Sequence, residues 1–194
     1  MDPAGVTVDY GENVSILATA NGVQPEEVSL VLEDADGRVV NDLPMLRNTD
    51  GKYAQTIEHA TQDLTYYAKI DRGRSKRFQL AIGKTPRIGA VNISYTYPAY
   101  TKLPARTRQL GPDGVVRAYE GTQVEMSIAS NRPLNGGELR VGGDKFELKP
   151  GGDPQSVVGK FTLKQSNDLE ARIVDIERNP SSDVFRGRIE IQPD

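Results

Sequence analysis

The stretch Leu64-Thr65-Tyr66-Tyr67-Ala68-Lys69-Ile70 decides the fold class. Its residues at every second position are apolar, which places one side of an extended strand in a core and the other side in water. We therefore predict a strand over 64–71 in which Leu64, Tyr66, Ala68 and Ile70 face inward. The same period of two recurs along the chain, and no long window carries the apolar spacing of a helix. The sequence therefore predicts an all-β protein.

The first half of the chain carries seven such segments. We predict its strands at 5–10, 13–20, 27–33, 38–43, 52–58, 64–71 and 75–82. The other inward residues expected are Val14, Ile16, Ala18, Ala20, Val28, Leu30, Leu32, Tyr53, Ile57, Phe78, Leu80 and Ile82. Asn21-Gly22, Asp36-Gly37, Asp50-Gly51 and Arg72-Gly73 separate these strands and supply the positive φ of tight turns. Seven short strands with such turns are typical of a β-sandwich.

The second half repeats this scheme. We predict its strands at 88–97, 115–119, 122–130, 138–142, 145–149, 157–164, 169–176 and 184–191. The inward residues expected are Val91, Ile93, Tyr95, Tyr97, Val124, Met126, Ile128, Val157, Phe161, Leu163, Val184, Ile189 and Ile191. Gly83-Lys84-Thr85-Pro86 interrupts the pattern, because proline cannot donate to a ladder and glycine costs order. We therefore expect two domains, 1–84 and 85–194.

A weak internal repeat supports this division. Gly11-Glu12-Asn13-Val14 is echoed by Gly121-Thr122-Gln123-Val124, and Asp63-Leu64 is echoed by Asp168-Leu169. The offset falls from 110 to 105 residues between the two matches, which is what a shortened loop would produce. The two matches together favour duplication of one unit.

Composition narrows the possible functions. The 194 residues include one histidine, no tryptophan and no cysteine, which excludes thiol catalysis, thiolate metal sites and disulfide bonds. The formal net charge is −3, with no strong basic excess in either half, so nucleic acid is not an expected partner. The sequence has neither a long apolar run nor the basic and apolar regions of a signal peptide at its start. We expect membrane contact only through regions outside this sequence.

Two features suggest catalysis or metal binding, and both are better read as structural. His59 is the only imidazole, so any hydrolytic triad would need it, but it ends a strand and no Gly-x-Ser-x-Gly accompanies it. Glu33-Asp34-Ala35-Asp36-Gly37 resembles the start of a calcium loop, yet no glutamate stands at the twelfth position. We expect a solvated histidine and a polar hairpin turn, with no catalytic residues, no metal site and no cofactor.

Two further clusters are candidate surface contacts. Lys69, Arg72, Arg74, Lys76 and Arg77 gather at one reversal, either as an anion or acidic-glycan contact or as a charged edge that discourages aggregation. Tyr95, Tyr97 and Tyr100 suggest a sugar-stacking platform, but alternation assigns the first two to packing. The surface contacts that remain open are Tyr67, Tyr100, Arg72, Arg74, Lys76 and Arg77.

Thr61-Gln62-Asp63-Leu64-Thr65-Tyr66-Tyr67-Ala68 resembles the start of strand F in immunoglobulin-like and fibronectin-type sandwiches. The resemblance implies that Tyr66 is a corner tyrosine whose hydroxyl closes the turn before it. It also implies that Ala68 stands where antibody domains place the second cysteine. The second half departs from this pattern, because Ala171 occupies the place of Tyr66.

A second resemblance covers most of the chain. Pro98-Ala99-Tyr100-Thr101-Lys102-Leu103-Pro104, Glu120-Gly121-Thr122 and Asn131-Arg132-Pro133-Leu134 resemble tandem immunoglobulin-like modules of large, membrane-anchored bacterial envelope proteins of unassigned function. This resemblance implies an extracytoplasmic location and membership of a longer array. It transfers no catalytic residue.

The expected fold is therefore two tandem immunoglobulin-like antiparallel β-sandwiches. The expected function is a non-catalytic spacer or protein-interaction segment, whose partners are neighbouring domains of the same polypeptide or another envelope protein. The alternatives are a carbohydrate-binding module for cell-envelope glycans and an accessory domain of an enzyme whose catalytic part lies elsewhere.

Overall fold

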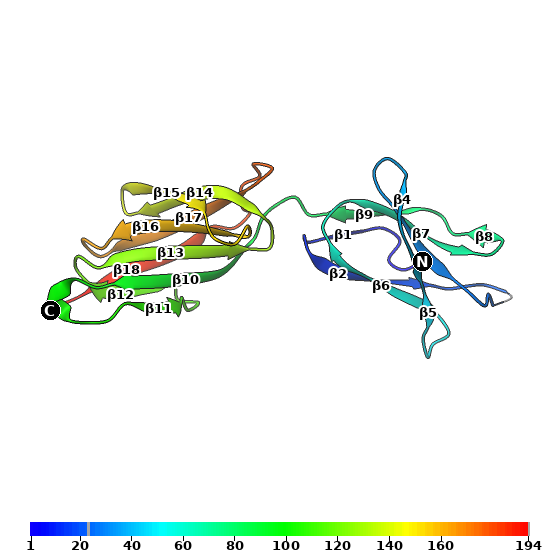
Figure 1. Ribbon diagram of the computed structural model, residues 1–194, viewed down its shortest axis with the longest axis horizontal. Coiled ribbons are helices and arrows are strands. Elements are labelled where there is room, and N and C mark those ends of the chain that lie inside the picture. Colours follow the sequence, from blue (N-terminus) through cyan, green and yellow to red (C-terminus); the bar gives the residue numbers. More distant parts are fainter. Residues whose placement is uncertain (23, 194) are drawn as a thin grey trace. The chain divides into compact units, whose positions relative to one another are not determined.

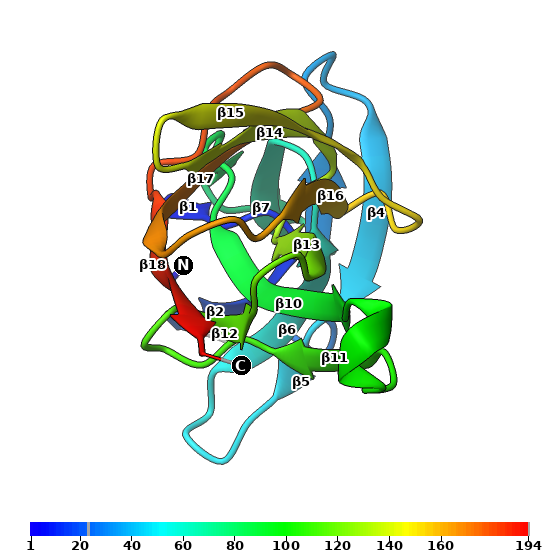
Figure 2. The same cartoon turned by 90° about the vertical axis from the view of Figure 1, so that its left-hand side faces the viewer.

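The structure is a computed structural model that describes residues 1–22 and 24–193. Strands dominate it, and one short 3-10 helix is the exception among the described residues (Figures 1 and 2). The chain divides into two compact units, Met1–Lys84 and Thr85–Asp194, and each is described by itself. No helix of the described residues is long and apolar enough to cross a membrane.

Unit 1 is a sandwich of two sheets. Its strands are β1 (Val6–Val8), β2 (Glu12–Ala18), β3 (Ser29–Glu33), β4 (Val39–Pro44), β5 (Leu46–Arg47), β6 (Tyr53–Ala60), β7 (Leu64–Ile70), β8 (Gly73–Arg74) and β9 (Phe78–Ile82). The larger sheet has the order β1-β9-β7-β3-β4, with β8 paired to β7, and the smaller sheet has the order β2-β6-β5. Strand β1 runs parallel to β9, whereas the other pairs in unit 1 are antiparallel.

The core of unit 1 follows the predicted alternation. Val14, Ile16 and Ala18 on β2 are buried, as are Leu30 and Leu32 on β3. Ile70 is an exception, because its side chain is 39% exposed. The prediction that it faces inward is wrong, since the last residues of β7 form a hairpin with β8 and leave the core.

Tyr66 is fully buried, but the expected role of its hydroxyl is wrong. The hydroxyl donates to the carbonyl oxygen of Pro3 at 2.7 Å and accepts from the N–H of Gly5 at 3.1 Å. It therefore holds the N-terminal segment instead of closing the turn before β7. Asp63 stabilises that turn, because its Oδ1 accepts from the N–H of Ile82 at 2.7 Å.

Unit 2 is a second sandwich with longer strands. Its elements are β10 (Ile88–Thr96), η1 (Ala99–Thr101), β11 (Arg106–Gln109), β12 (Val115–Tyr119), β13 (Gln123–Ser130), β14 (Leu134–Val141), β15 (Asp144–Pro150), β16 (Ser156–Thr162), β17 (Asn167–Asp175) and β18 (Phe185–Gln192). The hydrogen-bonded order is β11-β10-β13-β16-β15-β14-β17-β18-β12. Strand β15 joins the two layers, because it pairs with β14 over most of its length and with β16 only at its end.

The core of unit 2 also follows the predicted alternation. Ile93, Tyr95, Met126, Ile128 and Phe161 are buried in one cluster. Val184 does not belong to it, because β18 begins at Phe185. Strand β12 runs parallel to β18, as β1 does to β9 in unit 1. The prediction of two tandem immunoglobulin-like β-sandwiches is therefore confirmed, with one parallel pair in each.

Three short strands, β5, β8 and β11, were not expected. Strand β11 has the sequence Arg-Thr-Arg-Gln and pairs with β10 at the outer edge of its sheet. Its side chains carry no apolar alternation, because an edge strand with both faces near water needs none. Pairing alone defines such a strand.

Candidate functional site

The five basic residues that the sequence places at one reversal lie around the β7–β8 hairpin and the start of β9. Lys69 pairs with Asp42 at 3.4 Å, and Arg72 pairs with its neighbour Asp71 at 3.5 Å. Both pairs are largely exposed and contribute little to stability. Arg77 pairs with Glu33 at 2.9 Å. Three of the five expected cations therefore have an internal carboxylate partner.

Glu33 and Arg77 form the strongest contact of this group. The Nε and Nη2 atoms of Arg77 each donate to one carboxylate oxygen of Glu33 at 2.9 Å. The Glu33 side chain is only 8% exposed. The hydrogen bond from Arg77 lowers the pKa of Glu33 below its ordinary value of 4.5, and desolvation by burial opposes this shift. The pair thus holds a charged carboxylate against the outer face of the sheet.

Tyr67 lies beneath the same arginines. The guanidinium carbon of Arg77 lies 5.2 Å from the centre of the Tyr67 ring, and that of Arg74 lies 5.8 Å from it. These distances are typical of cation–π contacts. The Tyr67 side chain is 8% exposed, so the arginines and Tyr67 cover one another. This geometry favours a structural role for Tyr67, Arg74 and Arg77.

Tyr100 occupies a different environment in unit 2. It lies in η1, its side chain is 59% exposed, and its hydroxyl donates to the carbonyl oxygen of Glu120 at 3.3 Å. A surface cavity of about 310 Å³ is lined by Tyr100, Thr101, Leu103 and Tyr119. Leu103 is also exposed, at 45%. Tyr100 therefore presents an accessible ring with an apolar neighbour.

The other tyrosines expected near Tyr100 belong to the packing. Tyr95 is 2% exposed and stacks on Tyr97 with ring centres 5.8 Å apart. The Tyr95 hydroxyl accepts hydrogen bonds from Arg108 at 3.2 and 3.3 Å. The packing interpretation of Tyr95 is therefore confirmed, and this ring does not face a ligand.

His59 and the Asp34 turn have local structural roles. The backbone of His59 has a φ of 48° and its N–H donates to Asn13 Oδ1 at 2.9 Å, beside a register shift between β2 and β6. Asp34 Oδ1 accepts from the N–H groups of Asp36 and Arg38 at 3.0 and 2.9 Å. The expected polar hairpin turn is confirmed. Within residues 1–22 and 24–193 no group of three or more histidine or acidic side chains is arranged to hold a metal ion.

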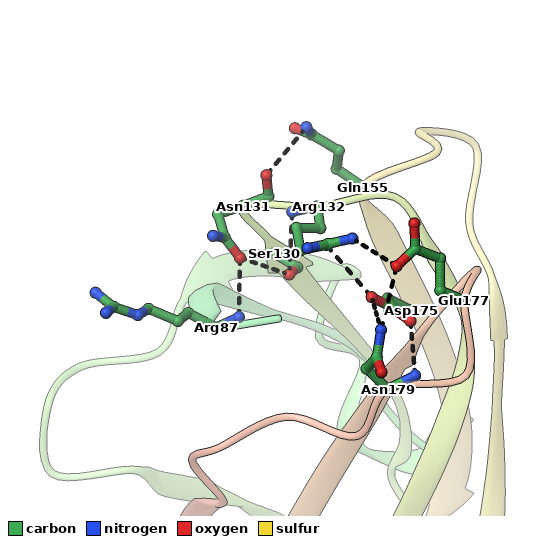
Figure 3. Close-up of polar contacts among 8 residues, drawn as sticks. All are labelled: Arg87, Ser130, Asn131, Arg132, Gln155, Asp175, Glu177 and Asn179. Atoms are coloured by element: carbon green, nitrogen blue, oxygen red, sulfur yellow. Dashed lines mark hydrogen bonds and ion pairs between the residues drawn. The ribbon is translucent and has the colours of Figure 1, made fainter. Parts of the chain in front are cut away.

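Sequence reasoning missed a buried polar cluster in unit 2 (Figure 3). The Arg132 side chain is 6% exposed and that of Asp175 is fully buried, and Arg132 Nε lies 3.3 Å from Asp175 Oδ2. Arg132 Nη2 contacts Glu177 Oε2 at 3.3 Å, and Asn179 donates to both Asp175 oxygens at 2.7 and 3.1 Å. The cluster connects the start of β14 to the loop after β17.

A second layer of contacts surrounds Arg132. Asn131 Oδ1 accepts from the Arg87 N–H at 2.8 Å, and its carbonyl oxygen accepts from Gln155 at 3.5 Å (Figure 3). Asp175, Glu177 and Asn179 place polar side chains at every second position, and this spacing is the sequence signal that could have indicated a cation bound between them. Arg132 supplies that cation from within the chain, so the arrangement stabilises the loop.

Unit 2 has a cavity with a volume of about 560 Å³. It lies where β15 separates from β16, and its walls include Phe146, Phe161 and Leu163. Lys160, Lys164 and other polar residues line the same space. No residue predicted from the sequence as a surface contact lies in it.

The sequence matches no protein-family model and no curated protein. Among solved structures, the fibronectin(III)-like modules of Clostridium thermocellum CbhA match with a TM-score of 0.38 and 14% identity, over 98% of this chain and 92% of that one. The eight N-terminal immunoglobulin domains of Down syndrome cell adhesion molecule match with a TM-score of 0.34 and 14% identity, over 96% of this chain and 23% of that one. A marsupial T cell receptor matches with a TM-score of 0.35 and 11% identity, over 95% of each chain. The fold of the chain rests on the order and register of the strands within each unit.

Proposed function

We propose that the chain is a non-catalytic, load-bearing spacer in a larger bacterial extracytoplasmic protein. The observation that carries this proposal is the attachment of the N-terminal segment of unit 1 by the Tyr66 hydroxyl and by parallel strand pairing. A spacer must keep its units folded when its two ends are pulled apart. Both features resist that kind of force.

In unit 1 the first and last strands lie side by side. Val6, Thr7 and Val8 of β1 pair with Leu80, Ala81 and Ile82 of β9 in parallel. Pulling the N-terminal end of β1 and the C-terminal end of β9 drives the strands past each other along their axes. The hydrogen bonds between them then carry the force together instead of opening one after another.

Tyr66 reinforces this attachment from the core. Its hydroxyl joins Pro3 and Gly5, directly before β1, to a fully buried ring on β7. Burial raises the pKa of Tyr66 above its ordinary value of 10.0, so the hydroxyl keeps the proton that it donates to Pro3. Asp2 adds a reciprocal pair of backbone bonds with Leu17, each 2.8 Å long.

Unit 2 resists the same force with longer ladders. Its first strand, β10, pairs antiparallel with β13 at seven positions. Its last strand, β18, pairs in parallel with β12 at five positions, from Val115–Arg188 to Tyr119–Gln192. Force applied to the two ends of unit 2 therefore also acts along paired strands.

Force spectroscopy of the full chain, held at both ends, tests the proposal. We expect two separate unfolding events, one for each unit, and Tyr66→Phe should lower the unfolding force of one of them. Tyr53→Phe is the matched control, because the Tyr53 hydroxyl donates to the carbonyl oxygen of Pro25 at 2.6 Å, away from the pulled segment. Tyr66→Phe removes two hydrogen bonds and Tyr53→Phe removes one, and each lost bond should cost about 1 kcal/mol at equilibrium. An equal fall in unfolding force for both variants, or none for either, would contradict the proposal.

A second candidate function is contact with envelope glycans through Tyr100. The exposed ring of Tyr100 beside Leu103 is the observation that favours it, because aromatic faces pack against the apolar faces of sugars. Binding of the full chain to a glycan array, lost in Tyr100→Ala and retained in Tyr97→Phe, would support this candidate. Flat binding across the array would reject it.

A further inference from the structure

Strand β16 has one paired edge and one partly open edge. It pairs with β13 at seven positions, from Gln123–Thr162 to Ala129–Ser156. On its other side it pairs with β15 only at Lys149–Val158 and Pro150–Val157. Figure 1 shows β16 running beside β13 while β15 runs beside β14. Among the described residues, the β15–β16 ladder does not continue past Val158.

The direction of the backbone groups along the open edge follows from the bonds at both ends of β16. Gly151 donates to the carbonyl oxygen of Ser156 at 2.9 Å, so residue 156 faces β15. Leu163 donates to Thr122 at 2.9 Å, so residue 163 faces β13. Because successive residues of a strand direct their N–H and C=O groups to opposite sides, Lys160 and Thr162 direct theirs to the open edge.

The 560 Å³ cavity lies along this edge. Phe146 on β15 and Phe161 on β16 line it, with ring centres 5.9 Å apart. Val141 and Leu163 add further apolar surface. Next to the unpaired backbone groups there is therefore space and an apolar wall, which is what an added strand needs for its hydrogen bonds and for its alternate side chains.

The charged residues at the cavity do not block the edge. Lysines on edge strands commonly discourage pairing, but Lys160 Nζ binds Glu125 Oε2 at 2.8 Å. Glu125 lies opposite Lys160 on β13, so this ion pair directs the lysine away from the open edge. The other two charged lining residues, Asp144 and Lys164, have opposite signs. The site therefore offers no net charge that would select a polyanion.

We propose that the open edge of β16 binds an extended peptide segment of a partner protein as an additional strand. Lys160 and Thr162 exchange main-chain hydrogen bonds with the peptide, and alternate apolar side chains of the peptide enter the cavity beside Phe146 and Phe161. The preferred peptide is uncharged and β-branched, because recognition rests on the backbone and on apolar contact. This site is independent of the spacer function.

The test uses the full chain, isotope-labelled for NMR, and a capped hexapeptide of alternating valine and threonine as the probe. We expect saturable shifts at 144–148 and 158–165. Thr162→Pro removes an N–H from the open edge and should weaken affinity at least tenfold. Thr162→Val keeps that N–H and should bind as the unchanged protein does. Proline is tolerated where a strand N–H faces away from its partner, and unchanged strand signals in unit 2 will establish that Thr162→Pro is folded.

Thr107→Pro is the matched control. Leu110 donates to Val91 at 2.7 Å, so by the same alternation Thr107 directs its N–H to the free edge of β11, on the opposite side of the same sheet. This variant should bind the probe with unchanged affinity. The proposal would be overturned if no shifts appeared at millimolar peptide, or if the shifts appeared at β11 or β4 instead. It would also be overturned if both proline variants lost affinity for the peptide equally. Self-association of the chain through β16 without peptide binding would also overturn it.

Discussion

The two units attach their first segment to the core in different ways. In unit 1, Tyr66 on β7 is fully buried, and its hydroxyl reaches across to Pro3 and Gly5. At the corresponding position of unit 2 stands Ala171, which is 1% exposed. There the buried tyrosine is Tyr95, on the first strand itself.

This difference shows that one fold can secure its first strand with a side chain or with a ladder. The N-terminal segment of unit 1 forms only a short strand, β1, so a hydroxyl from the core supplies bonds that the backbone does not make. Strand β10 is nine residues long and pairs with both β11 and β13. A ladder of that length makes a hydroxyl clamp unnecessary.

The largest expected effect is a loss of stability in unit 2 that leaves unit 1 unchanged. Asp175→Ala leaves the buried Arg132 without its main carboxylate partner, and breaking a buried ion pair costs about 3–5 kcal/mol. The loss should be confined to unit 2. Hydrogen exchange of the full chain should therefore show faster exchange in β14 and β17 and unchanged exchange in β3 and β7. Glu177→Gln is the control, because that side chain is 59% exposed. Equal acceleration in both units would show that they unfold as one.

A smaller effect tests whether unit 2 lacks room for the tyrosine that unit 1 uses. Ala171→Tyr inserts a ring into a packed core, and overpacking costs about 1–3 kcal/mol. We expect a lower denaturation midpoint for unit 2 alone. Ala90→Tyr, at an exposed position of β10, provides the control for added aromatic surface. If Ala171→Tyr instead stabilised unit 2, the core around Ala171 would have room for a tyrosine ring. Packing would then not explain why the two units differ at this position.

The smallest expected effect concerns acid. Because Arg77 lowers the pKa of Glu33 below 4.5, this carboxylate stabilises unit 1 above that pH, and its contribution is lost as the pH falls through the lowered value. Glu33→Gln should lower the stability of unit 1 at pH 7 and make it less dependent on pH below 4.5. Denaturant titrations between pH 3 and 7 (about the range in which carboxylates titrate) provide the measurement. Glu147→Gln, at a carboxylate that is 75% exposed, should change neither quantity. An unchanged dependence of stability on pH below 4.5 in Glu33→Gln would show that Glu33 does not stabilise unit 1 through its charge.

Strands with one buried face were predictable, and edge strands were not. Val14, Met126 and Phe161 alternate with polar residues and are buried as expected. Strand β11 and strand β8 carry no such signal, because each is exposed and is defined by hydrogen bonds to a neighbour far along the chain or across a turn. Alternation of apolar and polar residues indicates that one face of a strand is buried. It therefore gives no signal for a strand that buries few side chains.

The candidate surface residues divide in the same way. The sequence placed Arg74 and Arg77 together, but it did not show that they cover Tyr67 or that Arg77 binds Glu33 from another strand. Tyr100 could be recognised as a tyrosine near a turn, and its exposure follows only from the position of η1. The residues Lys160 and Thr162 carried no signal at all.

The sequence by itself determined that the chain forms strands, where most of them lie and which side chains of most strands face inward, because a period of two is a local property that each segment expresses alone. Tertiary structure decided where the Tyr66 hydroxyl binds, that Arg132 meets Asp175, and that β15 leaves β16 after two paired positions. Each of these contacts joins segments that are distant in sequence or belong to different layers. Their geometry depends on how the sheets pack and not on any segment alone.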